Sequence, residues 1–306
     1  MSRVSAKAAV IIATLLLHAS GRSAEPSRLT SPGQLVAMTT MDLRRPISNR
    51  LTPVSPMKGE TTTPLNVPMF SRNRMAIWGG VAAGASYLAY EQSQASWGVS
   101  NGKFHFKDEL NDGLALSDET SHLFAAYHLT RALNTGYSWT GMSSTGARRL
   151  AAAHAWIWTF LVEYPIDALN PTQGFGATDL AFNTVGVLAA YQHTRPGPTP
   201  WWDIKISVKE SFFAGENRFI AHSNEQYDDY VYWLTARPVR HRYVPIWIGA
   251  GYSTTHGEWP QIDKELHLAV GTTIEDLAAM VNEDAAKFLR PLNFFFLNVG
   301  TKIVWE

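Results

Sequence analysis

The side chains best suited to chemistry lie on one face of an expected helix in the middle of the chain. A carboxylate, an amide and two small residues recur there at i, i+4, i+7 and i+11: Asp179, Asn183, Gly186 and Ala190. This spacing places all four on the same helical face. The face is therefore expected to pack closely against a neighbouring helix.

Three further ionisable residues stand at the ends of apolar helices or inside them: His122, Glu163 and Asp167. The carboxylates of Glu163 and Asp167 are four residues apart and converge if helical geometry persists past Pro165. An isolated charge in such surroundings costs several kcal/mol unless it is paired or bound to a metal ion. These three residues, with Asp179 and Asn183, form a candidate polar cluster.

The candidate cluster supports two interpretations. Carboxylates and an imidazole are common metal ligands and proton-transfer groups, which favours an acid/base or metal site. The alternative is a buried polar network that only fixes how the helices dock, with His122 bonded to a carboxylate and Asn183 to backbone. The chain has no HExxH, GxSxG or phosphate-binding glycine loop. No motif therefore selects a reaction, a cofactor or a metal.

Other polar residues are weaker candidates. His154 is expected to be an interfacial or core histidine. The pair Asp228 and Asp229 could bind a cation, but an exposed acidic turn is the expected structure. Ser207 and Ser253 lack the strand-turn-helix context of an activated nucleophile.

Apolar periodicity and capping residues predict four helices, at residues 75–90, 117–133, 146–162 and 179–191. Thr178 is the expected N-cap of the last helix. Gly79, Gly80 and Gly84 in the first helix favour close helix packing. That helix is short for a membrane span, so it is expected either to be buried in the core or to dip into a membrane.

The pattern changes after residue 200. Alternating polar and apolar residues predict a strand at 203–209, and further β-rich runs lie at 230–234, 244–252, 266–272 and 294–304. Residues 274–289 are predicted to form a helix. The expected fold is mainly α: a bundle of about four helices over 75–195, followed by a small mixed α/β or extended part over 201–306 that packs on the bundle.

The N-terminus has the pattern of a secretory signal peptide. Arg3 and Lys7 precede a short apolar run, and small residues follow it up to Gly21. We expect a signal peptide at 1–21 and an irregular leader at 22–74, which is rich in proline. The chain has no cysteine, so a lipid-modified N-terminal cysteine is excluded.

Charge and composition limit the possible partners. Lys plus Arg and Asp plus Glu each number 26, so no net charge draws the protein to nucleic acid. Charged residues are only 17% of the chain, while it has 11 tryptophans. Such a composition is typical both of proteins that contact lipid and of aromatic cores.

Residues 104–190 resemble the YfiM-like family of uncharacterised predicted periplasmic proteins and, more remotely, VanZ-like membrane proteins. The resemblance lies in a helix start at Asp118 to His122, Tyr127 and Arg131, the acidic pair, Gly174-Phe175, and the Asp-x-x-x-Asn-x-x-Gly helix at 179–186. Residues 227–234 and 245–252 also look like that family. Glu119 departs from the expected basic residue, and the absence of cysteine departs from the lipoprotein character of family members.

The resemblance implies an exported, periplasmic or envelope protein but no reaction. We expect a membrane-associated envelope protein with a non-catalytic structural or interaction role, whose partner is membrane lipid or another envelope component. The alternative is a membrane-proximal hydrolase or transferase that acts on a lipid or cell-wall intermediate. In that case Glu163 or Asp179 would serve as base or ligand, and His122 as acid or ligand. The sequence predicts no oligomeric state.

Overall fold

The computed structural model describes residues 69–109, 113–198, 200–210, 212, 224–239, 244–256 and 261–305. These residues form six α-helices and a five-stranded antiparallel sheet. The predicted mainly α fold is therefore wrong, because the C-terminal part builds a full sheet rather than a small addition to a bundle. The signal peptide expected at 1–21 and most of the leader expected at 22–74 lie outside the described residues.

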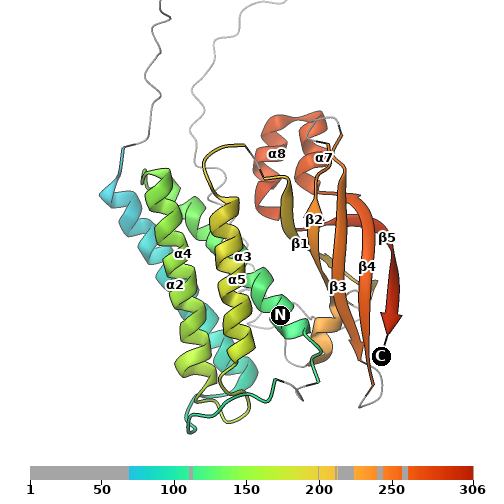
Figure 1. The fold of residues 1–306 in the computed structure, drawn as a ribbon. Helices are drawn as coiled ribbons and strands as arrows, with labels where there is room; N and C mark the ends of the chain where they lie inside the picture. The colour runs from blue at the N-terminus through green and yellow to red at the C-terminus, as the bar shows by residue number, and fades with distance from the viewer. Residues whose placement is uncertain are drawn as a thin grey trace, which may run out of the picture. The chain divides into compact units, whose positions relative to one another are not determined.

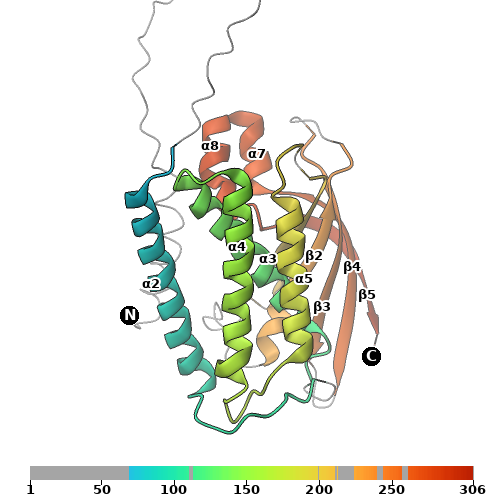
Figure 2. The same cartoon turned by 60° about the vertical axis from the view of Figure 1, so that its left-hand side comes forward.

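Four helices pack together on one side of the sheet (Figure 1). They are α2 (Arg72–Trp97), α3 (Ser117–Trp139), α4 (Ser144–Leu161) and α5 (Ala177–His193). All four were predicted, although their ends differ. Figures 1 and 2 show α3 between the sheet and the pair formed by α4 and α5. Side chains of α3 can therefore contact the sheet on one side and α4 and α5 on the other.

Helices α3 and α5 approach each other closely at Gly186. A Cβ atom at this position would lie 2.4 Å from the Leu123 carbonyl oxygen of α3, so only glycine fits. Asp179, Asn183, Gly186 and Ala190 are all buried along this side of α5. The spacing of these residues correctly predicted a closely packed helix face.

The helical core consists mainly of small side chains. Ala147, Ala151 and Ala155 of α4 pack with Ala126, Leu133, Tyr137 and Val187. Helix α2 joins this core through Trp78, whose ring meets Tyr137 edge to face with centroids 6.1 Å apart. Gly136 accommodates the same indole, because a Cβ there would lie 2.1 Å from it.

The predicted close packing at the glycines of α2 is wrong. A Cβ atom added at Gly79, Gly80 or Gly84 would have no described neighbour within 4 Å. These glycines lie along the helix away from the Trp78 contact, so they face open space. Among the described residues, no helix is both long enough and apolar enough to cross a membrane.

The sheet is an antiparallel meander in the order β1-β2-β3-β4-β5. Its strands are β1 (Trp202–Val208), β2 (Tyr230–Ala236), β3 (Trp247–His256), β4 (Ile262–Thr272) and β5 (Leu297–Trp305). Just before β5, Phe295 bridges to Ile206 on the free edge of β1. The sheet is therefore curled, and the residues just before β5 meet β1.

Two short helices, α7 (Ile274–Val281) and α8 (Glu283–Leu289), connect β4 to β5. The sequence predicted one helix over 274–289. Asn282 interrupts it, because its extended backbone ends α7 while its side chain accepts hydrogen bonds from the amides of Asp284 and Ala285. Asn282 thus acts as the N-cap of α8.

A buried charged group joins α3 to the sheet. Asp203 of β1 accepts hydrogen bonds from Tyr127 Oη at 2.7 Å and Arg131 Nη1 at 2.9 Å. Lys205 Nζ, which is fully buried, donates to the other Asp203 oxygen at 3.0 Å. Two cations therefore offset the cost of burying this carboxylate.

Replacing Gly186 by alanine should destabilise the protein, because the added methyl group collides with the backbone of α3. We expect Gly186→Ala to lower the free energy of unfolding by about 1–3 kcal/mol, measured by urea unfolding followed by circular dichroism. Gly84→Ala is the matched control. It should leave stability unchanged or raise it by up to about 1 kcal/mol, because alanine is the better helix former. Equal stability of Gly186→Ala and the wild type would contradict the close approach.

Candidate functional site

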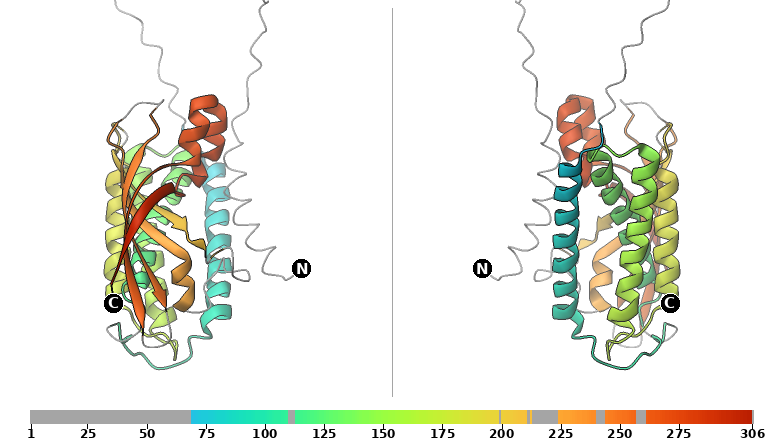
Figure 3. Two further views of the ribbon diagram at one scale, coloured as in Figure 1. Left: turned by 90° about the vertical axis from the view of Figure 1, so that its right-hand side faces the viewer. Right: turned by 90° about the vertical axis from the view of Figure 1, so that its left-hand side faces the viewer.

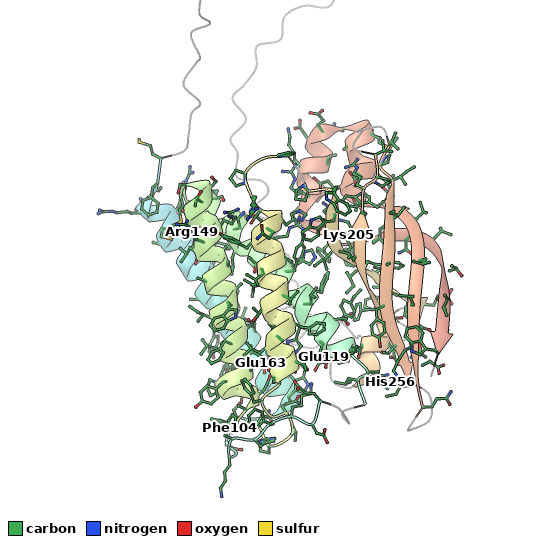
Figure 4. The ribbon with its side chains drawn as sticks, viewed as in Figure 1. Phe104, Glu119, Arg149, Glu163, Lys205 and His256 are labelled. Carbon is green, nitrogen blue, oxygen red and sulfur yellow. The ribbon has the colours of Figure 1, made fainter. Side chains whose placement is uncertain are left out.

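The candidate site lies where α3 and α5 begin and α4 ends. Asp118 and Glu119 occupy the first turn of α3, and Asp179 occupies the first turn of α5. Both helices start at this end, so their positive N-termini favour the carboxylates. Figure 4 shows Glu119 and Glu163 near one another at this end of the helices.

His122 is the centre of the cluster. Its Nε2 atom lies 3.4 Å from Asp118 Oδ1 and 3.9 Å from Asp179 Oδ1. Its Nδ1 atom lies 3.5 Å from Glu163 Oε1 on the opposite side of the ring. Each ring nitrogen therefore faces carboxylate oxygen.

Asn183 links His122 to Glu163. Its Nδ2 atom lies 3.1 Å from His122 Nδ1 and donates to Glu163 Oε1, also at 3.1 Å. The structure thus brings together four of the five sequence-predicted residues: His122, Glu163, Asp179 and Asn183.

Asp167, the fifth predicted residue, ends the turn that follows α4. The chain continues from α4 into the π-helical turn Val162–Asp167, but Tyr164 within it has an extended backbone, with φ −144° and ψ 121°. The helical geometry on which convergence depended is therefore broken. Asp167 still acts through its charge, which contributes to the raised pKa of Glu163.

Lys107 is a member of the cluster that the sequence analysis missed. Its Nζ atom contacts Asp118 Oδ2 at 2.5 Å and Asp179 Oδ2 at 3.2 Å. Its backbone is held by a hydrogen bond from its amide to Phe175 O at 3.1 Å. Gly174 has φ +97°, and a Cβ there would lie 2.7 Å from the Lys107 amide nitrogen. Gly174, which the sequence analysis noted, is the residue that could have indicated this close contact.

Asp118 and Tyr227 complete the group. Tyr227 Oη donates to Asp118 Oδ1 at 2.6 Å, although 109 residues separate the two. The sequence analysis missed Asp118 as a site residue, although its i, i+4 spacing from His122 is typical of a helical contact, and no pattern in the sequence links Tyr227 to α3. The segment before β2 therefore reaches the helical site.

Thr178 does not cap α5 as predicted. The helix begins at Ala177 after Gly176, which has no side chain to cap it. Thr178 Oγ1 instead donates to Glu119 Oε1 at 3.1 Å. Gly176 leaves room for Asp179, since a Cβ at 176 would lie 2.2 Å from Asp179 Oδ2.

Charges within the cluster shift the pKa of each member. Burial alone would lower the pKa of His122, but the hydrogen bond and charge of Asp118 and the charges of Asp179 and Glu163 raise it to about 10. Burial opposes ionisation of Asp118, yet His122 and Lys107 hold its pKa well below the usual value. In the metal-free protein, His122 is therefore a cation at neutral pH.

The other carboxyl groups are harder to ionise. Burial, with the charges of neighbouring carboxylates, raises the pKa of Glu163 to about 8 and that of Asp167 to about 6. The pKa values of Asp179 and Glu119 are also raised, mainly by burial. Five carboxyl groups thus share two cations, Lys107 and His122. If all five carboxyl groups were ionised, their negative charges would outnumber the positive charges at the site.

Asp179 Oδ1 is, with Glu119 Oε2, one of two buried carboxylate oxygens of this group that lack a hydrogen bond from a described residue. One ligand atom each from Asp118, His122 and Asp179 lies within 4.8 Å of the others. Three ligands bound at 2.0–2.2 Å around a tetrahedral ion lie about 3.4 Å apart. The spacing of the three groups is close to that of a metal site.

A second polar cluster lies inside the curled sheet. Glu265 is 1% exposed and accepts hydrogen bonds from Ser253, Lys209 and Lys302. Burial alone would raise the pKa of Glu265, but these bonds hold it well below the usual value. A cavity of about 1110 Å³ adjoins this cluster, and Lys209, Lys302, His256 and His267 are among its lining residues.

This second cluster is built for stability. Lys209 Nζ donates to Thr254 O, Thr255 Oγ1 and Glu265 Oε2, which occupies all three of its N–H groups. Ser253 Oγ lies 2.9 Å from His267 Nε2, but Glu265 lies on that same nitrogen at 3.4 Å. In a catalytic triad the carboxylate would bind Nδ1 instead. Ser253 therefore lacks the arrangement of an activated nucleophile. The sequence context of Ser253 had led to the same expectation.

The pair Asp228 and Asp229 is not the exposed acidic turn that we expected. Asp229 is fully buried, and Asp228 Oδ1 lies 2.8 Å from His256 Nδ1. His256 Nε2 reaches the Gly113 carbonyl oxygen at 2.8 Å, so this group ties the sheet to the start of α3. Figure 4 places His256 at the same end as Glu119. His154, as predicted, is a contact residue of the helical core, where its Nδ1 atom lies 2.7 Å from Tyr137 Oη.

A pH titration followed by NMR tests the charge state of the metal-free cluster. The His122 imidazole should stay protonated through pH 8 and titrate near pH 10. Because its pKa is raised on folding, its contribution to stability is complete below pH 6.5 and is lost as the pH rises through 10. Asp118→Asn should move the titration toward pH 6.5. His128 is the internal control, since burial and Arg131 lower its pKa to about 3. A His122 titration near pH 6.5 in the wild type would contradict this description.

Comparisons with protein-family models, with curated proteins and with solved structures find no match to this chain. Its function must therefore be inferred from the geometry and charges of the His122 cluster.

Proposed function

We propose that this protein binds a divalent transition-metal ion through Asp118, His122 and Asp179, and that the ion serves a hydrolytic or group-transfer reaction. The observation that carries the proposal is the Asp179 Oδ1 atom. It is buried, accepts no hydrogen bond from a described residue, and lies 3.9 Å from His122 Nε2. A buried carboxylate oxygen that accepts no hydrogen bond is costly unless a cation completes its surroundings.

Lys107 and Glu163 orient the three ligands. Lys107 Nζ holds the Oδ2 atoms of both aspartates, while both Oδ1 atoms lie on the side of His122 Nε2. Glu163 faces the other ring nitrogen. Histidine ligands commonly donate their second ring N–H to a carboxylate, which fixes the orientation of the ring. The cluster therefore contains three residues that would bind the ion and two residues that would hold them in place.

The ligand types indicate the metal and its chemistry. One imidazole nitrogen and carboxylate oxygens suit ions such as Zn²⁺ or Mn²⁺, and the lack of cysteine excludes thiolate ligands. Three protein ligands leave positions for water or substrate, as in hydrolytic metal sites. A bound ion of this kind lowers the pKa of water and polarises ester or phosphoester oxygen.

Location and substrate class extend this proposal. The N-terminal pattern and the resemblance to YfiM-like proteins favour an exported envelope protein. A lipid or cell-wall intermediate is the substrate class that fits that location. The competing function is a purely structural network, in which the proton on His122 permanently occupies the place of the metal.

Metal binding distinguishes the two functions. Isothermal titration calorimetry of chelator-treated protein at pH 8 should show one Zn²⁺ or Mn²⁺ site. Affinity should rise about tenfold for each pH unit between 6 and 8, because binding displaces the proton of His122. His122→Ala and Asp179→Asn should abolish the site. Asp284→Asn, which changes an exposed carboxylate on α8, is the control and should bind as the wild type does. Absence of binding by folded wild type would contradict the proposal.

The variant Glu163→Gln tests whether Glu163 holds the ligand His122 in place. Glutamine keeps the size of the side chain and can still accept from Asn183, but it cannot ionise to stabilise the His122 N–H when a metal ion is bound. We expect metal affinity to fall about 10- to 100-fold, as for other changes behind a ligand. Unchanged metal affinity in a stable Glu163→Gln variant would show that Glu163 does not support the ligand.

Catalysis is tested separately. The zinc- or manganese-loaded protein should hydrolyse bis(p-nitrophenyl) phosphate or p-nitrophenyl acetate faster than His122→Ala does under the same conditions, and a chelator should abolish the difference. Metal binding without turnover of either ester would reject the proposed reaction class while keeping the site.

A further inference from the structure

The outer face of β3, β4 and β5 has an unusual distribution of side chains. Residues that point into the curled sheet include the polar Ser253 and Glu265, each 1% exposed, beside a buried apolar cluster that contains Trp247 and Ala269. Residues that alternate with them are apolar and face outward. Val299 is 85% exposed, Ile303 60% and Val270 55%. An antiparallel sheet usually buries one apolar face and exposes a polar one, whereas these strands carry apolar residues on the exposed face as well.

Strand register makes these residues one continuous surface. Ile248, Val270 and Val299 are paired across β3, β4 and β5, and Leu266 is paired with Ile303 four residues along. Leu268 lies between those rows and is 52% exposed. We call this surface, formed by Ile248, Leu266, Leu268, Val270, Val299 and Ile303, the outer sheet face.

The described helices do not cover this face. Helix α3 packs on the β1 and β2 side, where Tyr127 joins Ile204 and Phe124 meets Tyr232 with ring centroids 5.8 Å apart. In the left view of Figure 3, β4 and β5 lie in front and the helices behind them. The curl of the sheet therefore turns its last strands away from the helical layer.

The chemistry of the face fits a lipid surface. Its six residues are all aliphatic, and Thr301, which is paired with Leu268, adds one hydroxyl group between Val299 and Ile303. At one margin Trp305, 43% exposed, is paired with Lys264. Tryptophan and lysine at the margin of an apolar surface suit the boundary between acyl chains and head groups.

A second copy of the chain fits the face less well. Neighbouring strands lie about 4.8 Å apart and same-face residues about 6.7 Å apart. Three strands by three such steps give roughly 300 Å² in projection, whereas a stable complex buries about 800 Å² of each partner. The face is also the outside of a curled sheet, so two copies would meet along convex surfaces. A lipid surface can adapt to that curvature.

We propose that the outer sheet face docks this protein on the surface of a lipid bilayer by inserting its apolar side chains among the acyl chains. This docking is independent of the metal site. It requires no anionic lipid, because the face recognises apolar chains rather than head-group charge.

Flotation with phosphatidylcholine vesicles tests the docking surface. The wild type should float with these vesicles, and added salt or phosphatidylglycerol should change its partition little. Val299→Asp combined with Ile303→Asp should lower the partition coefficient at least about tenfold, because two exposed apolar side chains would carry charge. Leu188→Asp is the matched control. Leu188 is 56% exposed on α5, and this variant should float as the wild type does.

Two controls distinguish loss of docking from loss of folding. Circular dichroism should give the same melting curve for all three proteins. If the aspartate pair does not fold, Val299→Thr combined with Ile303→Thr retains β-branching and should still weaken flotation. The proposal is overturned if wild type does not float or if the folded paired variant floats equally well. It is also overturned if light scattering finds a wild-type dimer that the paired variant dissociates, which would assign the face to self-association.

Discussion

The close contact between α3 and α5 is the constraint on which the candidate site depends. Gly186 lets the backbones approach, and the approach brings the first turns of both helices together with Asp118, Asp179 and His122 between them. Buried carboxylates at this spacing repel one another, so the contact is stable only with positive charge between them. In the metal-free protein Lys107 and protonated His122 supply that charge. A divalent ion would supply it more completely and would release the proton of His122.

Helix α3 carries two buried charged groups that differ in one respect. Toward its middle, Tyr127 and Arg131 bind Asp203, and Lys205 takes the second oxygen, so that carboxylate is fully paired. At the start of the helix, Asp179 Oδ1 accepts no hydrogen bond from the described residues. The Asp203 group therefore joins the helices to the sheet, whereas the His122 group keeps the buried carboxylate oxygen at which we propose a metal ion. Lys205 and Glu163 mark these two positions in Figure 4.

The sequence predicted local features better than their assembly. The helix spacing of Asp179, Asn183 and Gly186 identified the packed face of α5, because periodicity depends only on local geometry. The β-rich runs were visible, but their pairing into one sheet was not, since strand order depends on distant residues. Lys107 and Tyr227 escaped notice for the same reason: each reaches Asp118 through the tertiary fold. The resemblance to YfiM-like proteins and the expected export stay predictions.

Anomalous X-ray diffraction from crystals soaked in zinc or manganese salt tests the central claim most directly. The account predicts one strong peak within about 2.0–2.2 Å of a carboxylate oxygen of Asp118, of His122 Nε2 and of Asp179 Oδ1. It also predicts that Glu163 accepts a hydrogen bond from His122 Nδ1. A soaked crystal with the same side-chain arrangement but no peak among these atoms would contradict the claim, and the cluster would then be a network that only fixes the docking of the helices.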